Sequence, residues 1–168
     1  RYCVDFALAN RSLMMDRITA IFLEAENMTF EPPINIAHNY AVMEHHFGRN
    51  VLVHRKGATS ARTNEVGIIP GSQGTSSYIV RGKGNEDSFM SCSHGAGRKM
   101  GRKQAIRTLD IEEEKRKLND RGIIHSIRGI DDLDEAAGAY KPIEVVMEEQ
   151  KDLVEIVEKL EPLAVIKG

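Results

Sequence analysis

Between residues 50 and 93 the sequence alternates short apolar runs with clusters of turn-forming residues, and this alternation restricts the fold more than any other feature. The runs are NVLVHR (50–55), VGIIP (66–70), SYIVRG (77–82) and SFMSCS (88–93). Each has the length and composition of a short strand. Because helical patterns lie on both sides, we expect an α+β fold in which a mixed, short-stranded sheet is flanked by helices.

Helices are predicted in four segments. Residues 5–25 carry apolar side chains at helical spacing, namely Leu13, Met14, Ile18, Ile21 and Phe22. Residues 143–160 form a second stripe, with Val146, Leu153, Val157 and Leu160. Further helices are expected over residues 95–107 and 110–120. Short strands are expected from residue 34 to His38 and over residues 163–168.

Length and composition exclude several classes of protein. A chain of 168 residues is expected to form one domain. No apolar run approaches the ~20 residues of a membrane span, so no membrane association is expected. The two cysteines, Cys3 and Cys92, provide no disulfide framework, which favours the cytoplasm. The sequence starts at Arg1 rather than at a methionine, so we expect it to be part of a longer protein.

Charge is distributed unevenly along the chain. Residues 49–107 contain eleven Lys and Arg against three acidic residues, whereas residues 108–168 contain nine against sixteen. Ten of the fourteen glycines fall between Gly48 and Gly101. Glycine allows backbone to approach a ligand closely, and neighbouring Lys and Arg indicate that the ligand is an anion. The acidic C-terminal part is interpreted as a solvated surface.

Two glycine-containing loops are candidates for contacts to this anion. In GIIPGSQGTSSY (67–78), Ser72, Ser77 and backbone amides can hydrogen-bond a nucleotide, although the Walker A pattern is missing and a structural turn is the alternative. In HRKGATSAR (54–62), Arg55 and Lys56 precede Gly57. These residues indicate either phosphate contact or an exposed loop with unpaired basic side chains, and the segment alone favours neither.

The segment SCSHGAGR (91–98) contains the strongest candidate for chemistry. If a helix begins after His94, the amides of residues 95–97 point toward its side chain and form an anion site, to which Arg98 adds a guanidinium. A neutral imidazole there can attack phosphorus. Cys92 is the rival nucleophile. From the residues alone, His38 is interpreted as structural, because His45 and His46 complete no recognisable metal-ligand pattern with it. His125 is interpreted as structural because it follows the apolar pair Ile123 and Ile124.

Seven motifs together identify a family. They are FALANR, HNY, HRKGAT, IPGSQGTSSY, SCSHGAGR, GAYK and the terminal VIKG, and they occur in this order over residues 6–168. The chain resembles the C-terminal part of the RtcB family of RNA-splicing ligases. The resemblance implies joining of an RNA 3′-phosphate or 2′,3′-cyclic phosphate end to a 5′-hydroxyl end. It also implies that GTP and manganese are required and that a histidine–GMP intermediate forms.

The resemblance assigns roles to individual residues. It makes His94 the nucleophile and His38 a manganese ligand, with Asn39 beside the nucleotide. It places the guanylate against Pro70, Gly71, Ser72, Gln73, Ser77, Gly95, Ala96 and Gly97. It implies that Tyr140 stacks on the guanine and that Lys167 reads a guanine edge. Arg55, Lys56 and Arg98 are then expected to hold nucleotide or RNA phosphates.

One departure from the family pattern concerns the metal. The other manganese ligands of the family lie in N-terminal motifs, and none of these motifs occurs in the 168 residues. We therefore expect residues 1–168 to be the guanylate-binding C-terminal portion of a ligase, with the N-terminal metal-binding part of the same protein as a partner. The other expected partners are RNA, as tRNA halves or broken RNA, and an archease-type activator. A non-catalytic module that binds RNA or guanine nucleotides, and an interaction domain acting through the acidic C-terminal helix, are the alternatives.

Overall fold

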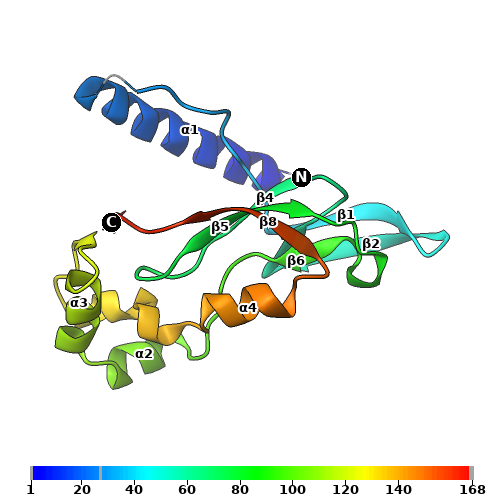
Figure 1. Ribbon diagram of the computed structural model, residues 1–168. Helices are drawn as coiled ribbons and strands as arrows, with labels where there is room; N and C mark the ends of the chain where they lie inside the picture. Colours follow the sequence, from blue (N-terminus) through cyan, green and yellow to red (C-terminus); the bar gives the residue numbers. More distant parts are fainter. Residues whose placement is uncertain (1, 27, 167–168) are drawn as a thin grey trace.

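The computed structural model describes residues 2–26 and 28–166 and shows small sheets with short helices on one side and a long helix on the other (Figure 1). The strands are β1 (Asn39–His46), β2 (Arg49–Lys56), β3 (Ala58–Ser60), β4 (Val66–Ile69), β5 (Ser77–Gly82), β6 (Ser91–Ser93), β7 (Ile124–His125), β8 (Val154–Leu160) and β9 (Ala164–Val165). The α-helices are α1 (Tyr2–Ala25), α2 (Arg102–Thr108), α3 (Ile111–Asn119) and α4 (Ile143–Glu149). The 3₁₀ helices are η1 (Glu86–Ser88), η2 (Ile130–Glu135) and η3 (Ala137–Ala139).

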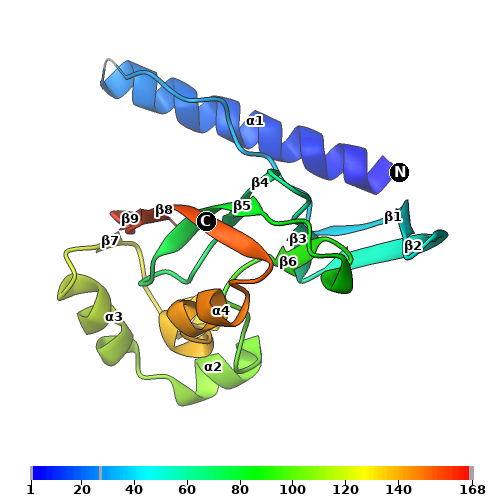
Figure 2. The same cartoon turned by 45° about the vertical axis from the view of Figure 1, so that its right-hand side comes forward.

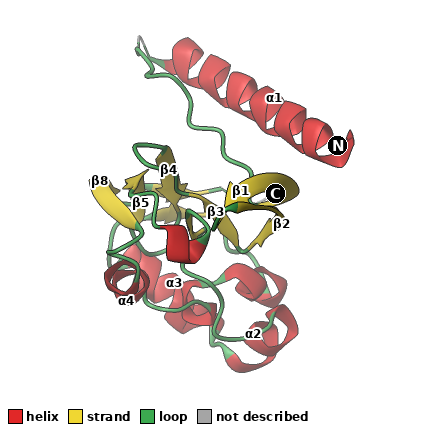
Figure 3. Ribbon diagram, turned by 90° about the vertical axis from the view of Figure 1, so that its right-hand side faces the viewer, coloured by secondary structure: helices red, strands yellow, loops and turns green. Residues whose placement is uncertain are grey.

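The strands pair in four small sheets. Strands β4, β5 and β8 form an antiparallel sheet in that order, β1 pairs with β2, β3 pairs antiparallel with β6, and β7 pairs parallel with β9. The strand layer lies between α1 and the three shorter helices (Figure 3). The α+β class is therefore confirmed, although the strands are divided among several sheets.

The β1–β2 hairpin matters most for the site. Its two-residue turn contains Phe47 and Gly48, both with positive φ (53° and 74°), as a type I′ turn requires. The register runs from His46 opposite Arg49 to Asn39 opposite Lys56. The open end of the hairpin therefore holds His38, which precedes β1, close to Gly57, which follows β2.

The hydrophobic core lies between β5 and α4. Tyr78 and Val80 alternate on the buried face of β5, and Ile143 and Met147 of α4 belong to the same buried cluster. Helix α4 lies on the side of the strand layer opposite α1 (Figure 2). Burying an aliphatic side chain of this size contributes about 1.5–3 kcal/mol. Helix α1 contributes no buried residue, so α4 stabilises the strand layer and α1 does not.

Several sequence predictions are confirmed by the observed elements. The first helix, the helix at residues 110–120 and the strands at residues 50–55, 66–70 and 77–82 all form, with small shifts of their ends. The terminal strand is shorter than predicted, because β9 contains two residues. Among the described residues, no helix combines the length and apolar content needed to cross a bilayer.

The single helix predicted over residues 143–160 is wrong. Helix α4 ends at Glu149, and the chain continues as β8, in which Val80 of β5 pairs with Ile156. The sequence after the turn is rich in β-branched residues, which suit a strand, and pairing with β5 outweighs the helical spacing. The acidic C-terminal helix that was considered as an interaction surface therefore does not exist as one helix.

Two other boundaries also differ from the predictions. The helix expected at residues 95–107 begins only at Arg102, because the glycine-rich segment before it is irregular and Gly97 has a φ of +71°. The expected strand at residues 88–93 is restricted to β6, since Phe89 and Met90 both have positive φ. The strand expected from residue 34 to His38 does not form, and an unpredicted strand, β1, begins directly after it at Asn39.

Candidate functional site

His94 lies directly after β6 and is anchored on both sides by hydrogen bonds. Its own amide donates to the carbonyl of Gly57 (3.4 Å), and the amide of Ser93 donates to the side-chain oxygen of Gln150 (2.9 Å). The Ser93 hydroxyl donates to the Gly95 carbonyl (2.7 Å). Gln150 is buried at the end of α4, so the core of the fold positions the backbone that carries His94.

His38 and His94 meet at the open end of the β1–β2 hairpin. Their rings are stacked, with centroids 5.1 Å apart and an interplanar angle of 23°. Burial, followed by the charges of His94 and Arg11, lowers the pKa of His38 below its ordinary value. His38 therefore favours the neutral imidazole, the form that can bind a metal ion.

The two ring nitrogens of His94 differ in their surroundings. Nδ1 is buried and has no hydrogen-bond partner among the described residues, and the ring lies against Gly57. Nε2 is consequently the nitrogen that an incoming group can reach. The anion site expected at a helix N-terminus is wrong, because no helix begins after His94 and the amide of Ala96 donates to the carbonyl of Pro70 (3.0 Å).

The loop at residues 70–77 packs against the segment that follows His94. A Cβ atom at Gly71 would lie 2.2 Å from the Ser76 carbonyl oxygen, so only glycine fits this tight turn. Within the loop, the hydroxyls of Ser72 and Thr75 are hydrogen-bonded to each other (3.0 Å). The Gly71 amide donates to Ser77 Oγ (3.4 Å). The structure thus brings the predicted loop residues next to the His94 turn, with their hydroxyls bonded within the loop.

Tyr140 is held by a charged cluster. Arg98 donates to the Tyr140 hydroxyl (3.1 Å), and its guanidinium carbon lies 4.9 Å from the centre of the tyrosine ring. The hydroxyl of Tyr140 in turn donates to Glu135. Burial and the Glu135 carboxylate raise the pKa of Tyr140, which keeps the phenol protonated.

Glu135 also connects this cluster to two arginines. Its carboxylate lies 3.2 Å from Arg98, and Arg102 contacts it through two nitrogens at 2.9 and 2.8 Å. Arg98 donates further to the carbonyls of Met100 (3.0 Å) and Asp134. The expectation that Arg98 holds phosphate disagrees with this arrangement, because its guanidinium is already engaged in positioning Tyr140.

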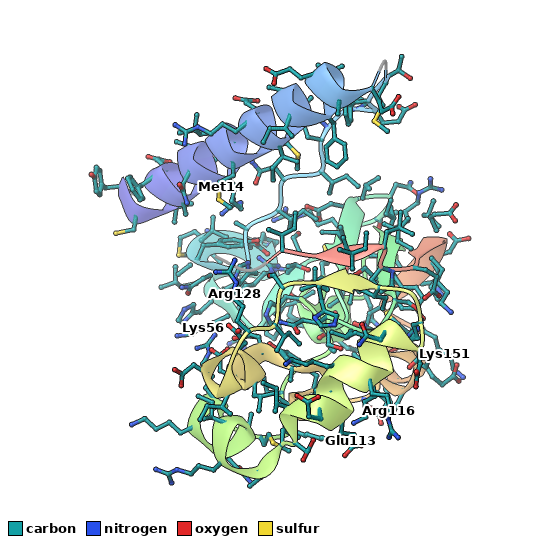
Figure 4. The ribbon with its side chains drawn as sticks, turned by 90° about the vertical axis from the view of Figure 1, so that its left-hand side faces the viewer. Met14, Lys56, Glu113, Arg116, Arg128 and Lys151 are labelled. Carbon is teal, nitrogen blue, oxygen red and sulfur yellow. The ribbon has the colours of Figure 1, made fainter. Side chains whose placement is uncertain are left out.

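Arg55 is wrongly predicted as a phosphate ligand. It is 1% exposed, and its five N–H donors are all engaged, with acceptors on Ser91, Tyr40, Glu44 and Phe89. The alternation of β2 points Arg55 into the molecule and Lys56 out of it. Lys56 alone of the three predicted phosphate-binding cations is exposed, and it lies at the edge of the molecule (Figure 4).

The remaining predicted residues have different outcomes. Asn39 is exposed at the start of β1, beside His38. Gln73 Oε1 is buried and lacks a hydrogen-bond partner among the described residues. Lys167 lies outside the described residues. His125 is hydrogen-bonded to Asn119 (3.1 Å) away from the His38–His94 pair, which agrees with a structural role.

The described residues do not by themselves form a manganese site. Within residues 2–26 and 28–166, no three His, Cys, Asp or Glu side chains converge in a way that could hold a metal ion. His38 is therefore a single candidate ligand. A tightly bound divalent ion needs several convergent donors.

Three residues of the site were missed from the sequence. Arg11 lies in the FALANR motif, whose presence was noticed without a role for its arginine. Glu135 precedes the GAYK motif by a few residues. Gln150 is a tertiary partner of the Ser93 amide and has no local sequence signal.

Comparison with known proteins identifies relatives over the whole chain. A family model described as "tRNA-splicing ligase RtcB" matches residues 1–168. The chain is 42% identical over 170 residues to "RNA-splicing ligase RtcB" of Escherichia coli strain K12, an alignment that covers 97% of this chain and 41% of the relative. It is 34% identical over 186 residues to the protein of the same name from Mycobacterium tuberculosis, covering 98% and 43%. It is 35% identical over 193 residues to "tRNA-splicing ligase RtcB" of Thermococcus kodakarensis, covering 98% and 40%. The chain thus spans about two fifths of the length of these curated relatives.

Proposed function

The chain belongs to the RtcB family of tRNA-splicing ligases, and from this premise we propose that residues 1–168 form the guanylate-binding portion of an RNA ligase. The ligase joins RNA ends that carry a 3′-phosphate or a 2′,3′-cyclic phosphate to 5′-hydroxyl ends. The observation that carries the proposal is the stacked pair of His38 and His94 on a glycine-flanked turn. Because the two imidazoles come from distant parts of the sequence and stack at one point, they can act on the same bound group.

In the proposed reaction, His94 is the nucleophile and GTP is a substrate. Nε2 of His94 attacks the α-phosphorus, a nitrogen–phosphorus bond forms, and the bond to the leaving pyrophosphate breaks. The guanylyl group then passes to the oxygen of an RNA 3′-phosphate. Attack by the 5′-hydroxyl oxygen on that phosphorus forms the new phosphodiester and releases GMP. A cyclic phosphate is first opened by hydrolysis. Burial of Nδ1 supports this assignment, because it leaves Nε2 as the reacting atom.

Recognition of the guanine is proposed for Tyr140 and Lys167. One face of the Tyr140 ring is covered by Arg98, so a base can stack only on the opposite face. The loop containing Gly71, Ser72, Gln73 and Ser77, together with Gly95, Ala96 and Gly97, is proposed to line the guanylate pocket. Its packing against the His94 turn supports this, since the Ala96 amide binds the Pro70 carbonyl.

Manganese is part of the proposed activity, but the chain supplies only one candidate ligand, His38. When bound, the metal would neutralise charge on the triphosphate. Because the described residues do not complete its coordination, its other ligands must come from elsewhere in the ligase. RNA is the proposed substrate, with Lys56 as an exposed contact to its phosphates. The other proposed partners are an archease-type activator and the N-terminal part of the same protein. The proposed location is the cytoplasm.

Comparing the binding of two nucleotides tests the proposed pocket. Isothermal titration of the 168-residue chain with GTP and with ATP should show weak binding that favours GTP. Equal affinity for the two would contradict a guanine-reading pocket and favour non-specific phosphate contact. Failure to bind either nucleotide would contradict the proposal as a whole.

A further inference from the structure

Arg11, on helix α1, lines the same cavity as His38. Its Nε donates to the side-chain oxygen of Asn35 (2.7 Å), and the Asn35 amide donates to Ser12 Oγ (3.3 Å). Asn35 lies in the linker that leads to His38, so two hydrogen bonds fasten the middle of α1 to the chain just before the site. Arg11 is half-buried in this position, although most of α1 is exposed.

The side chain of Arg11 lines a cavity that opens onto His38. This cavity, of about 250 Å³, is bounded by Arg11, His38 and Asn39 together with Cys3, Val4, Ala7 and Ala37. None of these lining residues is acidic. An adjoining cavity of about 260 Å³ is also bounded by Arg11, and Asp16 is the acidic residue on its wall. Arg11 therefore lines both cavities, and the cavity beside His38 is lined by a cationic side chain and by no carboxylate.

Arg11 differs from the other two candidate arginines, Arg55 and Arg98, in having guanidinium donors with which it can bind an anion in this cavity. Arg55 uses all its donors inside the molecule, and Arg98 is committed to Tyr140 and Glu135. For Arg11, the hydrogen bonds formed within residues 2–26 and 28–166 engage only Nε. Its two terminal nitrogens are left to form the forked pair of donors that suits phosphate.

We propose that Arg11 binds a phosphate group of a substrate that reacts at His94. This inference rests on the proposed function, because it takes the His38–His94 pair to be the reacting centre. The phosphate has two sources in that reaction, the triphosphate of GTP and the 3′-phosphate of RNA. Both present the same oxygens to a guanidinium, and binding measurements separate them.

The test uses the 168-residue chain and four probes. These are GTP, guanosine, an RNA oligonucleotide with a 3′-phosphate and the same oligonucleotide with a 3′-hydroxyl. Affinities of the wild type, Arg11→Met and Arg11→Lys are measured by NMR titration, and Arg17→Met, an exposed arginine on the same helix, is the control. Circular dichroism checks that each variant is folded, and Arg11→Lys retains the charge if Arg11→Met does not fold.

Loss of a charge-assisted contact should weaken binding of the phosphate-bearing probe about tenfold in Arg11→Met. The loss should be smaller in Arg11→Lys and absent in Arg17→Met, and affinity for guanosine should not change. For the RNA probe, the slope of log K against log salt should also fall by about 1. A loss confined to GTP assigns the contact to the nucleotide, and a loss confined to the 3′-phosphate RNA assigns it to the RNA end.

Three results would overturn the inference, and one of them would also contradict the proposed function. If the wild type and Arg11→Met bind both phosphate-bearing probes equally, Arg11 is not a phosphate ligand and the proposed function stands. If the wild type binds none of the four probes, the proposed function fails and the inference fails with it. Equal losses for guanosine and GTP in Arg11→Met would show a structural role and also overturn the phosphate contact.

Discussion

Glu44 joins the hairpin to the rest of the protein through buried charges. Its carboxylate accepts hydrogen bonds from Arg55 (2.6 and 3.0 Å), His46 (2.8 Å) and Arg62 (2.8 Å) while its side chain is only 7% exposed. Arg55 therefore works as the counter-ion of Glu44. The hydrogen bonds from Arg55 are the main cause that lowers the pKa of Glu44 from its ordinary 4.5 to about 2.

The lowered pKa of Glu44 determines how the free energy of unfolding should depend on pH. Because the folded-state pKa is depressed, the contribution of Glu44 is fully present above pH 4.5 and is lost as the pH falls toward 2. Glu44→Gln should lower the free energy of unfolding at pH 7 by about 3 kcal/mol, on the scale of this shift. Urea unfolding at pH 7 and at pH 3 measures both effects.

The exposed Glu148 of α4 offers the matched control. Glu148→Gln should leave stability nearly unchanged at both pH values, since surface ion pairs contribute little. A Glu44→Gln variant as stable as the wild type at pH 7 would contradict the structural role given to Arg55 and restore the phosphate role predicted from the sequence.

For single residues, the sequence shows which side chains are candidates for the site better than it shows which side chains they contact. His94 was recognisable because glycines surround it, and its neighbour His38 became a candidate only through the family resemblance. The role of Arg55 could not be predicted, because its acceptor Glu44 lies on the opposing strand and the contact depends on how the hairpin packs. Arg55 and Lys56 are adjacent basic residues beside Gly57 and look alike in the sequence, although Arg55 is buried and Lys56 is exposed.

Among the elements, the segment from η2 to η3 leads directly into Tyr140, the residue proposed to stack on the guanine. Tyr140→Ala should weaken guanylate binding by about 1–3 kcal/mol, the scale of base–aromatic stacking. Tyr140→Phe keeps the ring and loses the hydroxyl that Arg98 and Glu135 hold, so it should lose less. Equal affinities of Tyr140→Ala and the wild type for GMP, measured by calorimetry, would remove the stacking role.

A related prediction concerns base choice at Lys167, which lies outside the described residues. Lys167→Ala should reduce the preference for GTP over ATP, because a contact specific to guanine is lost. Competition titrations of the two nucleotides measure this ratio. Unchanged selectivity in this variant would contradict the role.

The exposed apolar side chains of helix α1 lead us to expect that the isolated chain associates with itself. None of the residues of α1 is buried, and large apolar side chains such as Phe6 (63% exposed) and Ile21 (65% exposed) face outward. Exposed apolar surface of this extent favours self-association. Sedimentation velocity should show concentration-dependent oligomers, and the double change Phe6→Glu with Ile21→Glu should shift the chain toward the monomer.

Val145 of α4 is half exposed on the other side of the strand layer and supplies a control. Val145→Glu should leave the association unchanged. A wild-type chain that stays monomeric at high concentration would show that α1 does not drive assembly.

The elements also show where sequence patterns fail. Helix α1 and the strands β2, β4 and β5 were predictable from local periodicity and turn residues, whereas β1 was not predicted. The division of residues 143–160 into α4 and β8 was not, because the same apolar spacing fits both structures and only pairing with β5 selects the strand. The late start of α2 follows from three glycines whose backbone freedom outweighs the expected helix.

At the scale of the whole molecule, the 168-residue chain is expected to bind guanine nucleotides but not to ligate RNA. The described residues offer His38 as one metal ligand, whereas the proposed reaction requires a coordinated metal. The purified 168-residue chain should therefore not join a 3′-phosphate RNA to a 5′-hydroxyl RNA in the presence of GTP and manganese. Gel analysis of labelled RNA measures joining. Robust ligation by this chain, free of any other ligase, would contradict the account of the missing ligands.

Covalent labelling of His94 tests the central claim most directly. The measurement uses a chimeric ligase in which residues 1–168 replace the corresponding part of the Escherichia coli relative, to which the chain is 42% identical. After incubation with GTP and manganese, intact-mass spectrometry should show one added GMP in the parent chimera and in His125→Ala. The adduct should be absent from His94→Ala. An adduct that persists in His94→Ala, or that peptide mapping places on Cys92, would contradict the claim that His94 is the nucleophile.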